Sequence, residues 1–450
     1  MPRTEYHWSG HGLFGRIAYD MLPEWEKEVI QPDMSPECLG KSYLPSCIEG
    51  VRDKVGYLCH VMDLVYYDEC RPYATLPDGR WIPHCPPDEM GQAASSTGAK
   101  TSPLASTQVT ELLMARMVDA IRANDWEVAV HHGGALAHYL QEPFTPGHAV
   151  DNNLFHELFP DPDPERHIRL HYAFDCATDR FEPLPVKLMG TSIPEASFRL
   201  QIELDRGIRE GKQYIRPVIE SVYAGEPAEA RQAILAPQSQ KATWITSCAW
   251  HTALCIAFER FDSVEVEALA KLDMTQMIPY FWHTCQYFEL LPGRLVQEHT
   301  KIPIHVWDAN PNGAKVEREV ARGFGMGGYM GVKFFVNGDV YNRFTCRVGL
   351  PSRQTEGQDA HTDTRFAVEV DSGLNNVYSE EIEYRATRIA ERQLRPGAPV
   401  QSMHVDITGA RTLILLAKSE PYTDAITGEV RWSIPHVAVC EPTLHRGARG

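Results

Sequence analysis

Two histidines and a carboxylate lie close together in the segment AHYLQEPFTPGHA at residues 137–149. His138 and Glu142 are four residues apart, which places them on one face of a helix. Pro143 ends that helix, and His148 follows after the turn. An isolated pair of this kind usually forms only an ion pair on a solvated face. Because imidazole and carboxylate are both good zinc ligands, the segment predicts a metal site if further ligands join it.

Further candidate ligands recur along the chain at similar spacing. The segment LHYAFD places His171 and Asp175 four residues apart, 23 residues after His148. Asp68 and His84 lie upstream, and His7 and His11 form another pair four residues apart near the N-terminus. A mixture of nitrogen and oxygen donors favours zinc, whereas calcium or magnesium would select oxygen alone. The set predicts a cluster of zinc ions rather than one structural ion.

The segment HYLQEPFTPGHA resembles the core motif of the zinc-dependent phospholipases C and the related fungal single-strand-specific nucleases. The resemblance covers about residues 5–290 and implies an all-α enzyme with three zinc ions in one cleft. It implies metal-ligand roles for His11, Asp68, His84, His138, Glu142, His148, His171 and Asp175. For the position of Asp68, the alternatives Asp53, Asp63 and Glu69 stay open.

Two features depart from the family pattern. The family usually has Asp, bridging two ions, where this chain has Glu142. It also uses the amino group of an N-terminal Trp, whereas Trp8 follows seven other residues here. His7 and the imino group of Pro2 are candidate replacements for that ligand. We therefore expect two or three zinc ions.

The resemblance implies a phospholipase C-like hydrolase in which zinc-activated water attacks a phosphodiester. Asp68 would be the catalytic residue that orients this water or accepts its proton. The Asp20 that follows nine residues after His11 favours the phospholipase branch. A nuclease or 3′-nucleotidase on the same site is the alternative, favoured by the interval from His148 to His171. A non-catalytic glycan-binding protein with a vestigial metal site is the alternative of another class.

Helical periodicity surrounds these motifs. We expect a short helical entry over 1–30, a helix from about 107, and a second helix capped by Asp125 and running to Glu142. Further helices are expected within 194–292. His251 lies among apolar residues of one of them, so we expect a core histidine with a hydrogen-bond partner rather than a ligand.

The pattern changes from helical to alternating near residue 296, which predicts an α-helical domain over 1–297 and an all-β jelly-roll sandwich over 298–450. The glycines at 323–331 predict a β-turn. The strand from Tyr341 to Phe344 and the VDITGARTLIL run at 405–415 resemble NPCBM-type, galactose-binding-like carbohydrate-binding domains. This resemblance implies a glycan partner, and a purely structural sandwich is the alternative.

Composition sets outer limits on the function. The chain has 450 residues, 43% of them hydrophobic, and a formal net charge of −17, which disfavours a stable complex with nucleic acid. No apolar run reaches membrane-spanning length. The 11 cysteines form no CxxC pair, so a zinc ribbon is not expected. The N-terminus shows no signal-peptide pattern, although the resemblance implies secretion.

Overall fold

The computed structural model describes residues 5–30, 103–149, 158–159, 173–174, 176–284, 290–297, 300–310, 312–354, 362–372, 386–423, 427–431 and 435–447. The chain divides into two compact units, Met1–Glu267 and Ala268–Gly450. The sequence pattern had predicted this division between residues 297 and 298.

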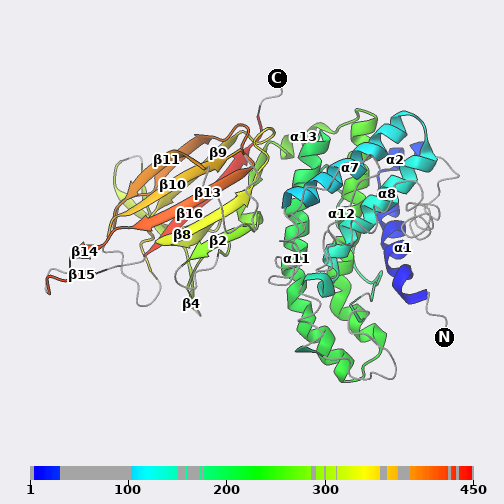
Figure 1. The fold of residues 1–450 in the computed structure, drawn as a ribbon, viewed down its shortest axis with the longest axis horizontal. Helices are drawn as coiled ribbons and strands as arrows, with labels where there is room; N and C mark the ends of the chain where they lie inside the picture. The colour runs from blue at the N-terminus through cyan, green and yellow to red at the C-terminus, as the bar shows by residue number, and fades with distance from the viewer. Residues whose placement is uncertain are drawn as a thin grey trace, which may run out of the picture. The chain divides into compact units, whose positions relative to one another are not determined.

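The first unit is helical, as predicted (Figure 1). Its described helices are α1 (Glu5–Asp20), α2 (Glu24–Val29), α7 (Pro103–Arg122), α8 (Trp126–Gln141), α11 (Ile193–Tyr223), α12 (Ala228–Ala257) and α13 (Ser263–Ala268), with the 3₁₀ turns η3 (Glu142–Phe144) and η4 (Pro146–Ala149). The predicted cap of α8 is confirmed, because Asp125 Oδ1 accepts the backbone N–H of Val128 at 3.2 Å. Asn124, at a φ of 56°, ends α7 just before it.

Helix α12 forms the centre of the helical core. It packs against α1, α7, α8 and α11, and its side chains are almost all buried from Ala242 to Ile256. Trp250 is its largest buried residue, and the indole Nε1 donates to the carbonyl oxygen of Gly133 on α8 at 2.9 Å. Helix α12 is buried on nearly every side. Its contacts therefore fix the positions of the neighbouring helices along its axis.

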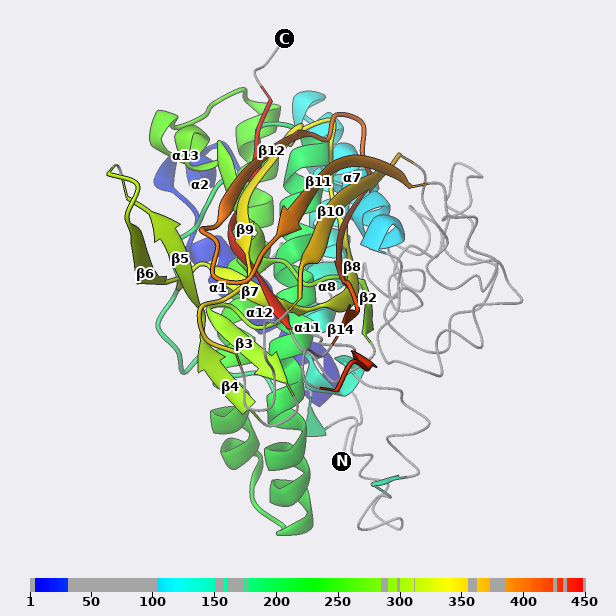
Figure 2. The ribbon, with the colours of Figure 1, turned by 90° about the vertical axis from the view of Figure 1, so that its left-hand side faces the viewer.

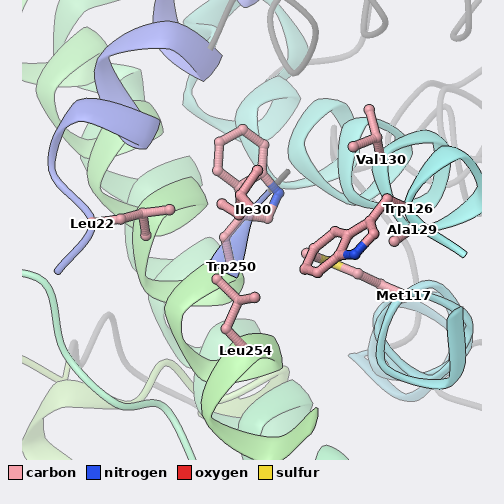
Figure 3. Close-up of a pocket in the computed structure, with 8 residues that line it drawn as sticks. All are labelled: Leu22, Ile30, Met117, Trp126, Ala129, Val130, Trp250 and Leu254. Carbon is pink, nitrogen blue, oxygen red and sulfur yellow. The ribbon is translucent and has the colours of Figure 1, made fainter. Parts of the chain in front are cut away.

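A small cavity of about 20 Å³ lies beside Trp250 (Figure 3). It is lined by Leu22, Ile30, Met117, Trp126, Ala129, Val130, Trp250 and Leu254. The indole N–H of Trp126 donates to Asn124 Oδ1 at 3.0 Å. Because its lining is apolar, the cavity is a packing gap and does not offer the polar partners that an ordered water needs.

The second unit is built from antiparallel strands, as predicted (Figure 2). Its strands are β1 (Lys271–Asp273), β2 (Phe281–Thr284), β3 (Arg294–Gln297), β4 (Thr300–Pro303), β5 (His305–Ala309), β6 (Lys315–Glu319), β7 (Gly323–Gly327), β8 (Tyr329–Phe335), β9 (Arg343–Gly349), β10 (Thr364–Asp371), β11 (Thr387–Leu394), β12 (Gln401–Asp406), β13 (Thr412–Ser419), β14 (Tyr422–Thr423), β15 (Val430–Arg431) and β16 (His436–His445). One sheet has the order β1-β16-β9-β12, with β7 also paired to β16, and the other has the order β11-β10-β13-β8-β2.

The two five-stranded sheets face each other across an apolar core. Phe324 on β7 and Phe334 on β8 come from different sheets, and their ring centroids are 6.0 Å apart. Buried and half-buried residues alternate along β8, as the period of a strand requires. Three two-stranded ribbons, β3-β4, β5-β6 and β14-β15, complete the described part of this unit.

Two local predictions differ from the structure. The helices expected up to residue 292 end at α13, and β1 and β2 follow, because Pro279, Pro292 and Gly293 interrupt this stretch. Most of the glycine-rich segment is the buried strand β7, and the predicted turn is confined to Gly328, between β7 and β8. A Cβ at Gly325 would lie 2.7 Å from Leu295, so glycine there permits the close approach of β3. Within the described residues, no helix is both long and apolar enough to span a bilayer.

Candidate metal centre

Glu142 stands where α8 ends and η3 begins, and only 4% of its surface is exposed. The preceding residue, Gln141, donates from Nε2 to Thr246 Oγ1 on α12 at 3.0 Å. This buried hydrogen bond fixes the end of α8 against α12. A carboxylate buried at a helix end requires charge compensation or hydrogen bonds, which is the setting of a metal ligand or a core ion pair.

The turn that follows Glu142 is anchored on α11. Phe144 is buried against Gly207, where an added Cβ would overlap its ring. Pro146 lies against Gly211, one helical turn further along α11. The two glycines leave room for the turn, so the path from Glu142 to η4 is set by packing.

The 3₁₀ turn η4 carries the backbone of His148, and a second segment reaches it there. A Cβ at Gly147 would lie 3.3 Å from the Phe174 ring, which is itself buried. Phe174 precedes Asp175 and follows His171 by three residues. The two motifs singled out in the sequence therefore meet through described residues that lie within or beside them.

Helix α1 approaches the same region from the opposite side of Trp250. A Cβ at Gly15 would lie 3.7 Å from the Trp250 ring, while the carbonyl oxygen of Gly133 on α8 accepts the indole N–H of Trp250. Leu22, just after α1, and Trp126, at the start of α8, line the same cavity beside Leu254. Helix α1 therefore runs in the same direction as α12, and α8 runs in the opposite direction.

In this arrangement the backbone of His11 lies level with the C-terminal end of α8, measured along the helix axis. His11 is four residues before Gly15, about 6 Å along the helix axis at 1.5 Å per residue. Thr246 is likewise four residues before Trp250, and it bonds to Gln141. At the level of the backbone, the structure brings residue 11 of α1 close to the level of Glu142.

The predicted ligands differ in what the structure says of them. Glu142 has a described, buried side chain. For His7, His11, His138 and His148, the backbone is described within α1, α8 and η4, and the side chains lie outside the described part. Asp68, His84, His171 and Asp175 lie outside the described residues altogether. The donor set of imidazoles and carboxylates fits zinc, and the described backbone brings His138, Glu142 and His148 into one turn region.

A second group of candidate ligands comes together elsewhere in the helical unit. Glu26 on α2 and the pair His251 and Cys255 on α12 bring one ligand atom each to within 4.8 Å of one another. His251 Nδ1 lies 2.5 Å from Glu26 Oε1, and Cys255 Sγ lies 3.9 Å from the same oxygen. Glu265 Oε2, on α13, lies 3.4 Å from His251 Nε2. All three members of the group are buried.

Burial and pairing shift the protonation of this group. Burial raises the pKa of Glu26, while the nearby His251 opposes that shift. Burial alone would lower the pKa of His251, but hydrogen bonds with Cys255 and Glu26 raise it to about 10. His251 is thus a buried histidine with partners, as the sequence predicted. The spacing of four residues between His251 and Cys255 could have indicated this pair in the sequence. No sequence pattern indicated that the distant Glu26 joins them.

Comparisons with known proteins give weak likenesses. No family model and no curated protein matches the chain. The alpha-toxin of an avian strain of Clostridium perfringens is similar at 11% identity and a TM-score of 0.32, over 98% of this chain and 99% of that one. The CBM51 of Clostridium perfringens GH95, solved with methyl-galactose, is similar at 18% identity and a TM-score of 0.27, over 39% of this chain and 99% of that one.

A third solved structure, the CBM51-2 and INT domains of Clostridium perfringens ZmpB, is similar at 13% identity and a TM-score of 0.27. The match covers 39% of this chain and 31% of that one, so this chain matches about a third of that structure. TM-scores of this size do not establish a shared fold or activity.

Proposed function

We propose that the helical unit is a zinc-dependent phosphoester hydrolase of the phospholipase C type. His138, Glu142 and His148 would form the centre of its metal site, together with His11, Asp68, His84, His171 and Asp175. His7 is a further candidate ligand. A nuclease or 3′-nucleotidase activity on the same site remains the alternative.

The convergence of separate segments at the end of α8 carries this proposal. Glu142 is buried there, and η4 brings the backbone of His148 beside Phe174. The backbone of residue 11 in α1 lies near the same level along the helix axis. These segments come from distant parts of the sequence, and each contains or adjoins a predicted ligand. If the histidines at this helix end were there by chance, the other segments with predicted ligands would have no reason to meet at it.

The residues of the chain have separable roles in the proposed reaction. Zinc supplies Lewis acidity, which lowers the pKa of water and polarises a phosphoryl oxygen. Glu142 would hold negative charge at the centre of the site, where the Gln141 to Thr246 hydrogen bond fixes the helix end that carries it. Asp68 would orient the attacking water or accept its proton. The packing of Phe144 on α11 would keep His148 on the same side as Glu142.

Metal content tests the site directly. Elemental mass spectrometry would compare the wild-type protein with His148→Ala and with His404→Ala, which removes an exposed histidine of β12. We expect two or three zinc ions per chain at this centre in the wild type and in His404→Ala, and about one fewer in His148→Ala. Absence of zinc in the freshly purified wild type, with none taken up on incubation with Zn²⁺, would overturn the proposal.

A substrate panel decides between the two activities. Phosphatidylcholine vesicles, single-stranded DNA and a 3′-nucleotide would be incubated with the zinc-loaded protein, with His148→Ala as the inactive control. Release of a phosphorylated head group supports the phospholipase assignment, whereas cleavage of DNA or of the 3′-nucleotide supports the nuclease. Binding of a glycan by the β unit stays a prediction, for which methyl-galactose is a first probe.

A further inference from the structure

We infer that Glu26, His251 and Cys255 form a second metal site, which takes Zn²⁺ or a similar transition metal through a cysteine thiolate. This site lies on α2 and α12 and shares no residue with the predicted ligands of the candidate metal centre. Its role would be structural, because all three side chains are buried.

The distances between the ligand atoms fit a tetrahedral ion. Zinc bonds of about 2.0–2.3 Å imply edges of about 3.3–3.8 Å between neighbouring ligand atoms. Cys255 Sγ lies 3.8 Å from His251 Nδ1 and 3.9 Å from Glu26 Oε1. The contact of 2.5 Å between His251 and Glu26 is a hydrogen bond that would lengthen by roughly 1 Å when an ion replaces its proton.

An orphaned polar atom points to an absent ligand. Glu26 is fully buried, and its second carboxylate oxygen, Oε2, has no hydrogen-bond partner. A buried carboxylate oxygen left without a partner is costly, so native proteins seldom keep one. A cation bound by both carboxylate oxygens of Glu26 would satisfy Oε2 as well as Oε1, the oxygen that faces His251 and Cys255.

Glu265 flanks the group and contacts its histidine. Its Oε2 lies 3.4 Å from His251 Nε2, and its Oε1 accepts the backbone N–H of Leu188 at 3.0 Å. The carboxylate is therefore held in place from outside the group and is itself partly exposed. It would accept the Nε2–H of His251 and so leave Nδ1 as the nitrogen that binds the ion.

Such an ion would fasten the N-terminal helices to the core. Helix α2 already docks on the end of α12, where the Arg260 guanidinium lies 4.4 Å from the centroid of the Trp25 ring and Phe258 meets Trp25 edge-on. A metal bond between Glu26 and α12 would fix this docking. Because α1 leads directly into α2, it would also hold α1 against Trp250.

Cobalt substitution tests the site without using activity. The metal-free protein, prepared with a chelator, would be titrated with Co²⁺, and the near-ultraviolet band of thiolate-to-cobalt charge transfer would be recorded. The predicted ligands of the candidate metal centre include no cysteine, so this band does not depend on the proposed function. Failure of either proposal therefore leaves the other readable.

Three variants assign the band to this site. We expect Cys255→Ala to abolish it and to lower the zinc content by about one ion per chain. Cys248→Ala is the matched control and should keep the band. Cys248 is also buried on α12, but its Sγ accepts the backbone N–H of Lys187. Cys255→His keeps a ligand, so it should retain the ion without the band.

Two outcomes would overturn the inference. One is a wild-type protein that binds Co²⁺ without a charge-transfer band. The other is a band that persists in Cys255→His, because another cysteine would then be the ligand. If Cys255→Ala does not fold, the comparison of Cys255→His with Cys248→Ala still decides.

Discussion

The two units treat buried ionisable groups in different ways. In the helical unit, Glu26 and His251 face each other inside the core, and burial raises the pKa of Asp205 on α11 to about 7. In the β unit, burial instead lowers the pKa of His436 to about 4, so that this histidine is neutral at pH 7. The buried Glu369 pairs with Arg388, whose side chain is half-exposed.

This difference shows where each unit accepts a thermodynamic cost. Charged or proton-sharing groups inside a core cost desolvation energy and persist when paired or when they hold a ligand. The described part of the helical unit keeps such groups at several places, among them Glu142 and the group around His251. The β unit buries a neutral histidine, His436, and its buried Glu369 forms an ion pair with an arginine that reaches the surface.

The largest effect is expected at the buried pair of the helical unit. Glu26→Ala leaves His251 buried without its nearer carboxylate partner, which should lower the free energy of unfolding by about 3–5 kcal/mol. Urea unfolding in the presence of a chelator measures the pair without any metal contribution. Glu24→Ala, on the same helix, removes a carboxylate that pairs with Lys27 at the surface and should cost less than about 1 kcal/mol. Equal losses in the two variants would contradict the contrast between buried and exposed charge.

A smaller loss should follow from disturbing the packing that positions Glu142 and His148. Gly207→Ala forces the Phe144 ring out of its place, and such overpacking costs about 1–3 kcal/mol. It should also reduce the zinc content, since Phe144 lies between the two predicted ligands. Gly211→Ala is the control, because its Cβ would meet Pro146 at 3.8 Å, an ordinary contact.

Urea unfolding and elemental mass spectrometry of both glycine variants provide the measurement. Gly211→Ala should be as stable as the wild type or more so, since alanine is the better helix former. A Gly207→Ala protein with full stability and full zinc content would show that the turn after Glu142 does not depend on this packing.

Local signals in the sequence predicted the helices around the candidate centre. The cap at Asp125, the apolar spacing from residue 107 and the break at Pro143 each act within a few residues, and the structure confirms them. The two-layer antiparallel β unit was likewise visible in its alternation. The start of that unit was predicted too late, because β1 to β3 have at most four residues each and show little alternation.

Contacts between distant residues could not be predicted in the same way. Glu26 and His251 are 225 residues apart, and nothing in either local pattern indicates the other. The position of His11 relative to Glu142 depends on the contacts that α1 and α8 both make with Trp250. Trp250 is a core residue whose sequence context indicates no function. The roles of Asp68, His84, His171 and Asp175 stay predictions.

The last effect is expected in the β unit, and it appears only as the pH falls. The pKa of His436 is about 4 in the folded protein and about 6.5 when unfolded, so the unfolded chain binds the proton more tightly. The stability due to neutral His436 is therefore complete above pH 6.5 and is lost as the pH falls towards 4. One proton limits the slope of the free energy of unfolding against pH to about 1.4 kcal/mol per pH unit.

Calorimetric unfolding between pH 4 and 8 should show a shallower loss of stability at acid pH for His436→Gln than for the wild type. His404→Gln, at an exposed position of β12, should follow the wild type. Matching slopes for His436→Gln and the wild type would mean that the β unit buries this histidine without a protonation cost, and the contrast with the helical unit would no longer hold.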